Sequence, residues 1–189
     1  MRDQFLGLTQ PMLSILLDPG EGVMGEASRF AWMTDSIEMA VAGETGVCRY
    51  TAIGEPGVVA FASQRPGHIL SLEVGPQDEG YLVRRSGVMA RTPGVQVRAG
   101  PAEHGLVLWR IGGSGRAWVE LGGDVVRREL NPDQSLRAHP RHIGMFDTMV
   151  AIQVTQVDGI SGRDRGYPCA VLSGPGAVWL QSMPSAAEP

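Results

Sequence analysis

Glycine and proline occur so often in this sequence that they leave little room for long helices. The 189 residues include 26 Gly and 13 Pro, and both residue types destabilise helix interiors and favour turns. We therefore expect short strands separated by turns. Because 43% of the residues are hydrophobic, the chain can bury a core. The length fits one domain. We predict a single all-β domain over residues 1–184, followed by a flexible tail over residues 185–189.

Apolar residues recur with a period of two, as they do in half-buried strands. Leu70, Leu72 and Val74 alternate with polar neighbours, and residues 150–155 repeat the pattern. Runs bounded by turn residues predict further strands at residues 58–62, 81–83, 106–111, 117–121 and 177–181. A helix competes with this interpretation over residues 26–42, which lack Gly and Pro and carry apolar residues at helical spacing.

Three features recur along the chain at similar intervals, which indicates an internal repeat. Prolines beside acidic or amide residues occur at intervals of 57 and 56, at Pro19, Pro76 and Pro132. Two more columns are apolar residues about fourteen positions later and glycines that open apolar strands: Met33, Met89 and Phe146, then Gly57, Gly115 and Gly176. The alternative is that such turns are common in any β protein and that the period arises by chance.

The repeat predicts three quasi-repeats of about 57 residues, each forming a small sheet unit. A sheet of two or three strands cannot bury its apolar face alone. We therefore expect the three units to close around a shared axis into a β-sandwich or prism. The same repeat places a strand at residues 37–41 and disfavours the helix over residues 26–42.

Four segments carry a resemblance to a known family: residues 66–72 (PGHILSL), 85–90 (RSGVMA), 113–119 (GSGRAWV) and 173–182 (SGPGAVWLQS). Over residues 17–184 the sequence resembles the altered-inheritance-of-mitochondria protein 24 family. The resemblance implies a TRAP-like fold of the double-stranded β-helix type, similar to the β fold of the tryptophan RNA-binding attenuation protein. It also implies a homo-oligomer, for which we expect a trimer. Mitochondrial relatives are linked to inner-membrane organisation rather than to a reaction.

His139 and His142 are the weak candidates for a metal site. They flank Pro140 closely enough to bring two imidazoles together, and imidazole is a common metal ligand. Arg137 and Arg141 in the same stretch would repel a divalent cation, and no carboxylate follows at a cupin-like spacing. A charged turn is therefore the favoured interpretation, and we expect no metal and no cofactor.

No other motif assembles a reaction centre. Residues 112–115 (GGSG) resemble a phosphate-binding loop, but the residues that follow alternate as a strand, so we expect a hairpin. Ser114 and Ser173 lack the Gly-x-Ser-x-Gly pattern of a nucleophile elbow. All 16 basic residues are Arg, which excludes lysine chemistry. We therefore expect a protein that is not an enzyme.

Charge and composition also narrow the partners and the compartment. The net charge of -4 disfavours nucleic acids. Adjacent arginines, Arg84-Arg85 and Arg127-Arg128, point to opposite faces of a strand, and only Arg163 and Arg165 could share one face. We expect no integral membrane segment, although contact with a membrane surface stays open. Cys48 and Cys169 form no recognised motif, so we favour two reduced thiols and a cytoplasmic location.

The sequence therefore predicts a non-enzymatic, oligomeric scaffold or binding protein with an unidentified protein partner. The alternative is a small-ligand or metal-binding β-barrel, such as a cupin-like enzyme, with a pocket between its sheets. RNA binding, suggested by the TRAP-like fold, is less favoured.

Overall fold

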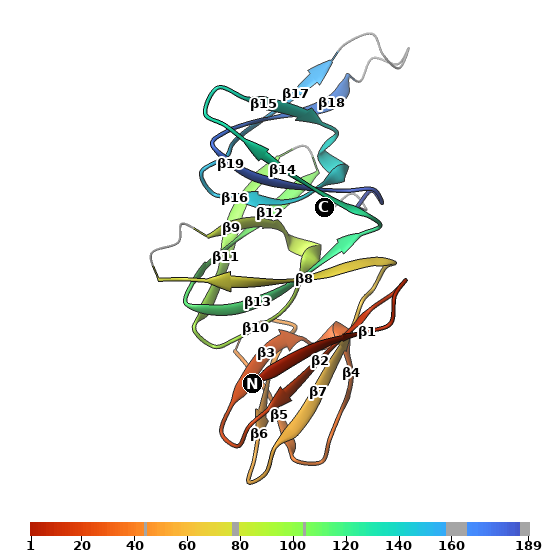
Figure 1. The fold of residues 1–189 in the computed structure, drawn as a ribbon, viewed down its shortest axis with the longest axis vertical. Coiled ribbons are helices and arrows are strands. Elements are labelled where there is room, and N and C mark those ends of the chain that lie inside the picture. Colours follow the sequence, from red (N-terminus) through yellow and green to blue (C-terminus); the bar gives the residue numbers. More distant parts are fainter. Residues whose placement is uncertain (44, 77–79, 104, 158–165, 186–189) are drawn as a thin grey trace.

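The computed structural model describes residues 1–43, 45–76, 80–103, 105–157 and 166–185. This part of the chain holds nineteen strands and three 3-10 helices of three residues each, and it holds no α-helix. The predicted all-β class is confirmed. Figure 1 shows an elongated molecule in which the chain progresses from one end to the other.

Apart from β1 (Arg2–Leu6), the strands form three units with the same order of pairings. Within each unit the sixth strand pairs with the first and third, and the fifth pairs with the second and fourth. Unit 1 contains β2 (Met12–Leu17), β3 (Gly22–Glu26), β4 (Phe30–Met33), β5 (Ile37–Val41), β6 (Val47–Ala52) and β7 (Gly57–Ala62). Unit 2 contains β8 (Gly67–Val74), β9 (Tyr81–Arg84), β10 (Val88–Arg91), β11 (Val95–Glu103), β12 (Leu106–Gly113) and β13 (Gly115–Gly122). Unit 3 contains β14 (Val125–Leu130), β15 (Ser135–Ala138), β16 (Ile143–Asp147), β17 (Ala151–Val157), β18 (Tyr167–Ser173) and β19 (Gly176–Gln181).

A 3-10 helix joins the second and third strands of every unit, namely η1 (Ala27–Arg29), η2 (Arg85–Gly87) and η3 (Pro140–His142). The third strand then carries an irregularity between its first and third residues, as at Phe30 and Trp32 in β4. This common bulge fixes which residues correspond between units. The glycine column of the sequence opens β7, β13 and β19 as expected, whereas Met89 lies two residues before Arg91, the counterpart of Met33.

The strands assemble into four sheets that stack as layers. Sheet A has the order β1-β2-β7-β4, sheet B β5-β6-β3-β10-β13-β8, sheet C β11-β12-β9-β16-β19-β14, and sheet D β15-β18-β17. A separate apolar core lies between each successive pair of sheets. Sheets B and C therefore bury residues on both faces, and each contains three strands from one unit and three from the next.

The units stand in a row, so the expectation that they close around a shared axis within one chain is wrong. β3 pairs with β10, and β9 pairs with β16, which joins unit 1 to unit 2 and unit 2 to unit 3. No pairing in the described chain joins unit 3 back to unit 1. Each junction pairs the second strand of one unit with the third strand of the next. In the described chain β4 and β15, the outermost strands of these two types, therefore each keep one edge without a strand partner.

The competing helix over residues 26–42 is also wrong. That stretch forms the short helix η1 followed by β4 and β5. Phe30 and Ile37 from this stretch pack in the core between sheets A and B, whereas Val41 is exposed. Tertiary pairing with β7 and β6 overrides the local helical spacing.

A buried arginine crosses each junction between units. Arg29 of unit 1, which is 2% exposed, reaches the carboxylate of Glu120 and the carbonyl oxygen of Ser86 in unit 2. Arg84 of unit 2 donates from Nε to the carbonyl oxygen of Ile143 at 3.0 Å and from Nη2 to that of Pro140 at 2.7 Å in unit 3. Both guanidinium groups therefore tie neighbouring units together.

A second set of hydrogen bonds uses corresponding acceptors at the two junctions. Glu120 Oε1 accepts the backbone N–H of Arg65 at 2.9 Å, from the loop that leaves unit 1. Gln181, at the same place in β19, accepts the backbone N–H of Gly122 at 3.1 Å, at the end of β13. Both side chains are buried, so each satisfies a chain segment that would otherwise lack a partner.

The Glu120→Ala variant tests the first junction. Removing one member of a buried ion pair leaves the Arg29 charge without its full partner, and we expect the free energy of unfolding to fall by about 3 kcal/mol. Glu73→Ala, which breaks an exposed ion pair with Arg116, is the matched control and should cost less than about 1 kcal/mol. Urea denaturation measures both, and equal losses would contradict the role given to Glu120.

Candidate functional site

Unit 1 leaves the outer edge of β4 without a strand partner. Within the described chain β4 pairs with β7 alone, whereas β10 and β16 also pair with the preceding unit. Trp32 on this strand is 41% exposed. Its counterparts Ala90 and Met145 are 1% and 0% exposed. A large apolar side chain thus stands exposed at a place that is buried in both other units.

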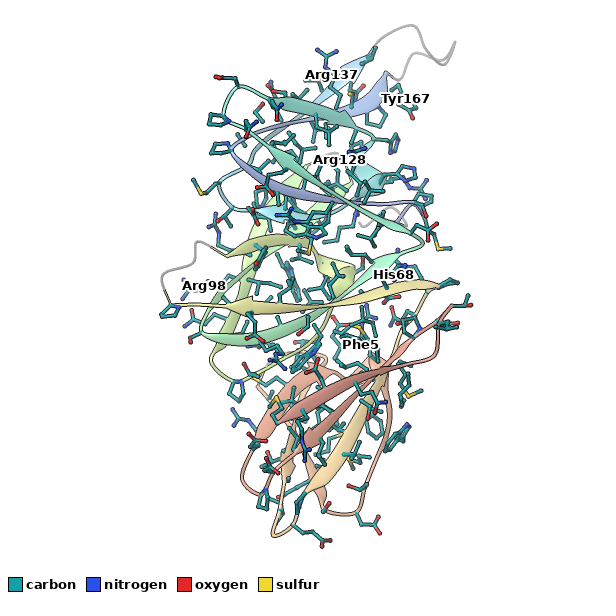
Figure 2. All side chains as sticks on the ribbon, viewed as in Figure 1. Phe5, His68, Arg98, Arg128, Arg137 and Tyr167 are labelled. Atoms are coloured by element: carbon teal, nitrogen blue, oxygen red, sulfur yellow. The ribbon has the colours of Figure 1, made fainter. Side chains whose placement is uncertain are left out.

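Unit 3 leaves the complementary edge without a strand partner. β15 pairs with β18 alone among the described strands, whereas β3 and β9 pair onward with β10 and β16. Ala138 on β15 is half-buried, and its counterparts Gly25 and Val83 are buried. In Figure 2 Arg137, the neighbour of Ala138, lies at the end of the molecule farthest from unit 1.

The outer face of sheet A is hollowed over β1, β2 and β7. A shallow depression of about 460 Å³ is lined by Arg2, Asp3, Gln4, Ser14, Leu16 and Val58. These residues belong to β1, β2 and β7. The corresponding face of unit 2 is covered, since Ile69 and Trp118 on that face belong to the core between sheets A and B. Unit 1 therefore exposes a sheet face and a strand edge whose counterparts in the other units are covered by the preceding unit.

His139 and His142 lie together, as their spacing suggested. Their ring centres are 6.1 Å apart, and the ring of Tyr167 lies 5.1 Å from that of His139. Both Nδ1 atoms are occupied by the backbone: His139 Nδ1 accepts the N–H of Arg141 at 3.2 Å, and His142 Nδ1 donates to the carbonyl oxygen of Gln181 at 2.9 Å. The structure therefore uses the pair to hold η3 and β19.

The electrostatic environment of His139 disfavours its charged form. Partial burial lowers the pKa of the imidazole below its ordinary value, and the neighbouring His142, Arg141 and Arg84 lower it further. Among the described residues no three His, Cys, Asp or Glu side chains gather closely enough to hold a metal ion. The weak metal candidates stay a prediction, and their surroundings are cationic.

The other motifs of the sequence have structural places. Residues 112–115 lie at the hairpin between β12 and β13, as expected. Arg84 is buried between units, while the guanidinium of Arg85 lies 5.9 Å from the ring centre of Trp109. The predicted pair Arg163 and Arg165 lies outside the described residues. Both Cys48 and Cys169 are free thiols.

The packed part of the chain extends through the first residue of the expected tail. Ser185 is buried, its N–H donates to the carbonyl oxygen of Arg141, and its hydroxyl accepts from Gln181 at 2.7 Å. Residues 186–189 lie outside the described residues. The predicted division at residue 184 stays a prediction, although Ser185 still makes these contacts.

A small cavity lies between sheets B and C, where the alternative interpretation places a ligand pocket. Its volume is about 20 Å³, and its lining includes Met24, Val88, Val97 and Trp109. That volume holds about one water molecule.

The three helices of the described chain have three residues each, so none of them could span a membrane.

The sequence analysis did not predict the exposed strand edges, because the period of two indicates strands but not their pairing partners. The signal that could have shown them is the residue type at one position of the repeat. Trp32 stands where units 2 and 3 carry Ala90 and Met145, but the column becomes visible only once the common bulge fixes the register. Asp3, whose partners are more than a hundred residues away, left no local signal.

Comparison with known proteins gives the family and the fold. A profile described as mitochondrial biogenesis AIM24 matches residues 4–183. The chain therefore belongs to the AIM24 family, and the resemblance seen in its motifs is confirmed. Comparison with functionally curated proteins finds no match.

A solved structure shows the same fold. The crystal structure of a protein from Streptococcus pyogenes matches with a TM-score of 0.81 and 16% sequence identity. The match covers 97% of this chain and 94% of the streptococcal chain. At that identity the likeness establishes the fold alone, and it is consistent with the predicted all-β class.

The His139→Gln variant tests the lowered pKa of His139. Below about pH 6.5 the unfolded chain takes up a proton on this residue more readily than the folded chain, so stability falls as the pH drops through this range. We expect His139→Gln to reduce the loss of thermal stability between about pH 7 and pH 5. Melting temperatures across that range measure the effect, and an unchanged slope would contradict it.

Proposed function

We propose that this protein is a non-enzymatic, homo-oligomeric scaffold in which β15 of one chain pairs with β4 of the next. The observation that carries the proposal is the contrast between Trp32 and its buried counterparts Ala90 and Met145. The same junction occurs twice inside the chain, and the two ends of the row hold its two unused halves. Pairing them would extend the existing architecture without a new type of contact.

The internal junctions suggest the register that we propose for this contact. β16 pairs with β9 through Met145 with Val83, Phe146 with Leu82 and Asp147 with Tyr81. Transferred to the chain ends, the same register would put Trp32 opposite Ala138, Met33 opposite Arg137 and Thr34 opposite Leu136. Sheet D of one chain and sheet A of the next would then form one continuous sheet, with the same halves that compose sheets B and C.

The proposed contact also covers the apolar surface at the end of unit 1. Trp32 and the outer face of sheet A would pack against sheet C of the neighbouring chain, as Ala90 and Trp118 pack beneath sheet A. Burial of apolar surface supplies the main favourable free energy for such an association. The backbone groups along β4 and β15 would gain the ladder partners that they lack within one chain.

A head-to-tail contact of this kind either closes into a ring or continues as a filament. The family resemblance suggests an oligomer, and we propose the closed form with three chains. The free thiols of Cys48 and Cys169 fit a reducing compartment, so a cytoplasmic location belongs to the same proposal. The repeated rim of such a ring would present equivalent binding surfaces to a protein partner.

The Trp32→Arg variant tests the assembly. We expect the wild-type protein to elute as three chains in size exclusion with light scattering, and Trp32→Arg to elute as a monomer because a charge would enter the buried contact. Met39→Arg on β5 is the matched control, since Met39 is 47% exposed and belongs to sheet B, which contains neither β4 nor β15. A wild-type protein that stays monomeric across a wide concentration range would contradict the proposal.

A disulfide between Trp32→Cys and Ala138→Cys tests the register. Residues that face each other in an antiparallel ladder have Cα atoms about 4.5 to 5.5 Å apart, which suits a disulfide. In a background carrying Cys48→Ser and Cys169→Ser, we expect oxidation to give a ladder of linked chains on non-reducing gels. Each single-cysteine variant is a control, and equal linkage in the controls would show that the strands pair differently or not at all.

A further inference from the structure

β1 has no counterpart in the other two units, and it shows how an extended segment can pair with the outer edge of a sheet. It pairs antiparallel with β2, with Asp3 opposite Ile15 and Phe5 opposite Leu13. Units 2 and 3 have no corresponding strand, so β8 and β14 end sheets B and C with an open outer edge in the described chain. The edge that β1 covers in unit 1 therefore stays open in units 2 and 3.

One side chain of β1 reaches the next sheet. Asp3 Oδ2 accepts the indole N–H of Trp118 at 3.0 Å, and Asp3 Oδ1 lies 2.6 Å from Nη1 of Arg116. Trp118 is fully buried. β1 is therefore held by its backbone ladder and by one carboxylate that bonds an indole and a guanidinium. Charge-assisted hydrogen bonds of this type are among the stronger ones in proteins.

The edge of β8 repeats this arrangement with its strand missing. Leu72 and Leu70 of β8 correspond to Ile15 and Leu13 of β2, as the pairings with β13 and β7 show. Trp179 of sheet C corresponds in the same way to Trp118. Trp179 is half-buried rather than buried, and within the described residues its Nε1 makes no hydrogen bond.

Trp179 also has a cationic side chain beside it. The guanidinium of Arg127 lies 5.2 Å from the centre of the Trp179 ring. Its side chain is about half exposed and forms an ion pair with the equally exposed Glu129. Arg127 lies opposite Trp179 across the pairing of β14 with β19, whereas Arg116 lies two residues before Trp118 on β13. Although the positions differ, each indole has a guanidinium nearby, so an incoming carboxylate could reach both an indole N–H and a guanidinium.

We propose that the outer edge of β8 binds an extended segment of a partner protein as an added antiparallel strand. The segment carries an acidic residue opposite Leu72, which binds Trp179 Nε1 and Arg127, and an apolar residue opposite Leu70, as Asp3 and Phe5 do in β1. Backbone pairing supplies affinity and the acidic residue supplies selectivity. β8 has eight residues and no proline, so its whole length can pair.

Of the two edges that correspond to the β2 edge, β8 is favoured over β14 by the residue in the next layer. For β14 the residue corresponding to Trp118 and Trp179 would be Ala60 of a neighbouring chain, as the pairing of Trp32 with Ala60 shows. Alanine offers no N–H to a carboxylate. In Figure 2 His68 marks the start of β8, and Phe5 lies on β1 below it. The β8 site lies within one chain.

This inference deepens the proposed binding role, and it does not require the oligomer. A peptide with blocked ends and the sequence of residues 1–6, Met-Arg-Asp-Gln-Phe-Leu, serves as the probe. Fluorescence anisotropy of the labelled peptide against the full-length protein measures binding. We expect Trp179→Phe, which keeps the ring and removes the N–H, to weaken binding about tenfold. Trp109→Phe, another half-buried Trp beside an arginine, is the matched control and should bind as the wild type does.

Two altered peptides separate strand addition from other binding. Replacing the aspartate by asparagine should weaken binding about tenfold, and N-methylation of alternate backbone amides should abolish it because the ladder cannot form. No binding at about 1 mM peptide, or equal binding by Trp179→Phe and Trp109→Phe, would overturn the inference. The Trp32→Arg variant should still bind, so failure of assembly and failure of the β8 site give different results.

Discussion

The structure depends on one constraint: a half-sheet of three strands cannot cover its own apolar face. Each unit contributes two such halves, and the chain solves the problem by joining halves from successive units into shared six-stranded sheets. Sheets B and C are therefore buried on both sides, with a core on each face. Only the first and last sheets remain incomplete, and they hold the surfaces from which the proposed assembly follows.

Polar contacts set the spacing between units that apolar packing alone would leave loose. Arg29 and Arg84 cross successive junctions, and each satisfies carbonyl or carboxylate oxygens of the next unit. Buried ions are costly unless they are fully paired, so these residues favour one arrangement of neighbouring units over slipped ones. The same reasoning makes the exposed Trp32 informative, because apolar surface of that size is rarely left uncovered at a place its counterparts bury.

Much of the fold could be predicted from the sequence. The period of two in segments such as Leu70–Val74 reflects strands with one buried face, and the glycines at positions 57, 115 and 176 mark the opening of equivalent strands. Closure within the chain was expected because small sheets must bury their apolar faces. The prediction was wrong because the sequence does not show which strand edges pair. His139 and His142 were found as neighbours, but their bonds to Arg141 and Gln181 depend on packing. Asp3 and Trp118, 115 positions apart, could be connected only by the fold.

The shared sheets have a consequence for how the molecule loses its structure. Melting one unit would strip its neighbour of three strands from a common sheet and open the core beneath it, so partial states are penalised on both sides of every boundary. Repeats that each had a complete core of their own could unfold one at a time. Because neighbouring units here share their sheets, unfolding should be cooperative over the full length of the row.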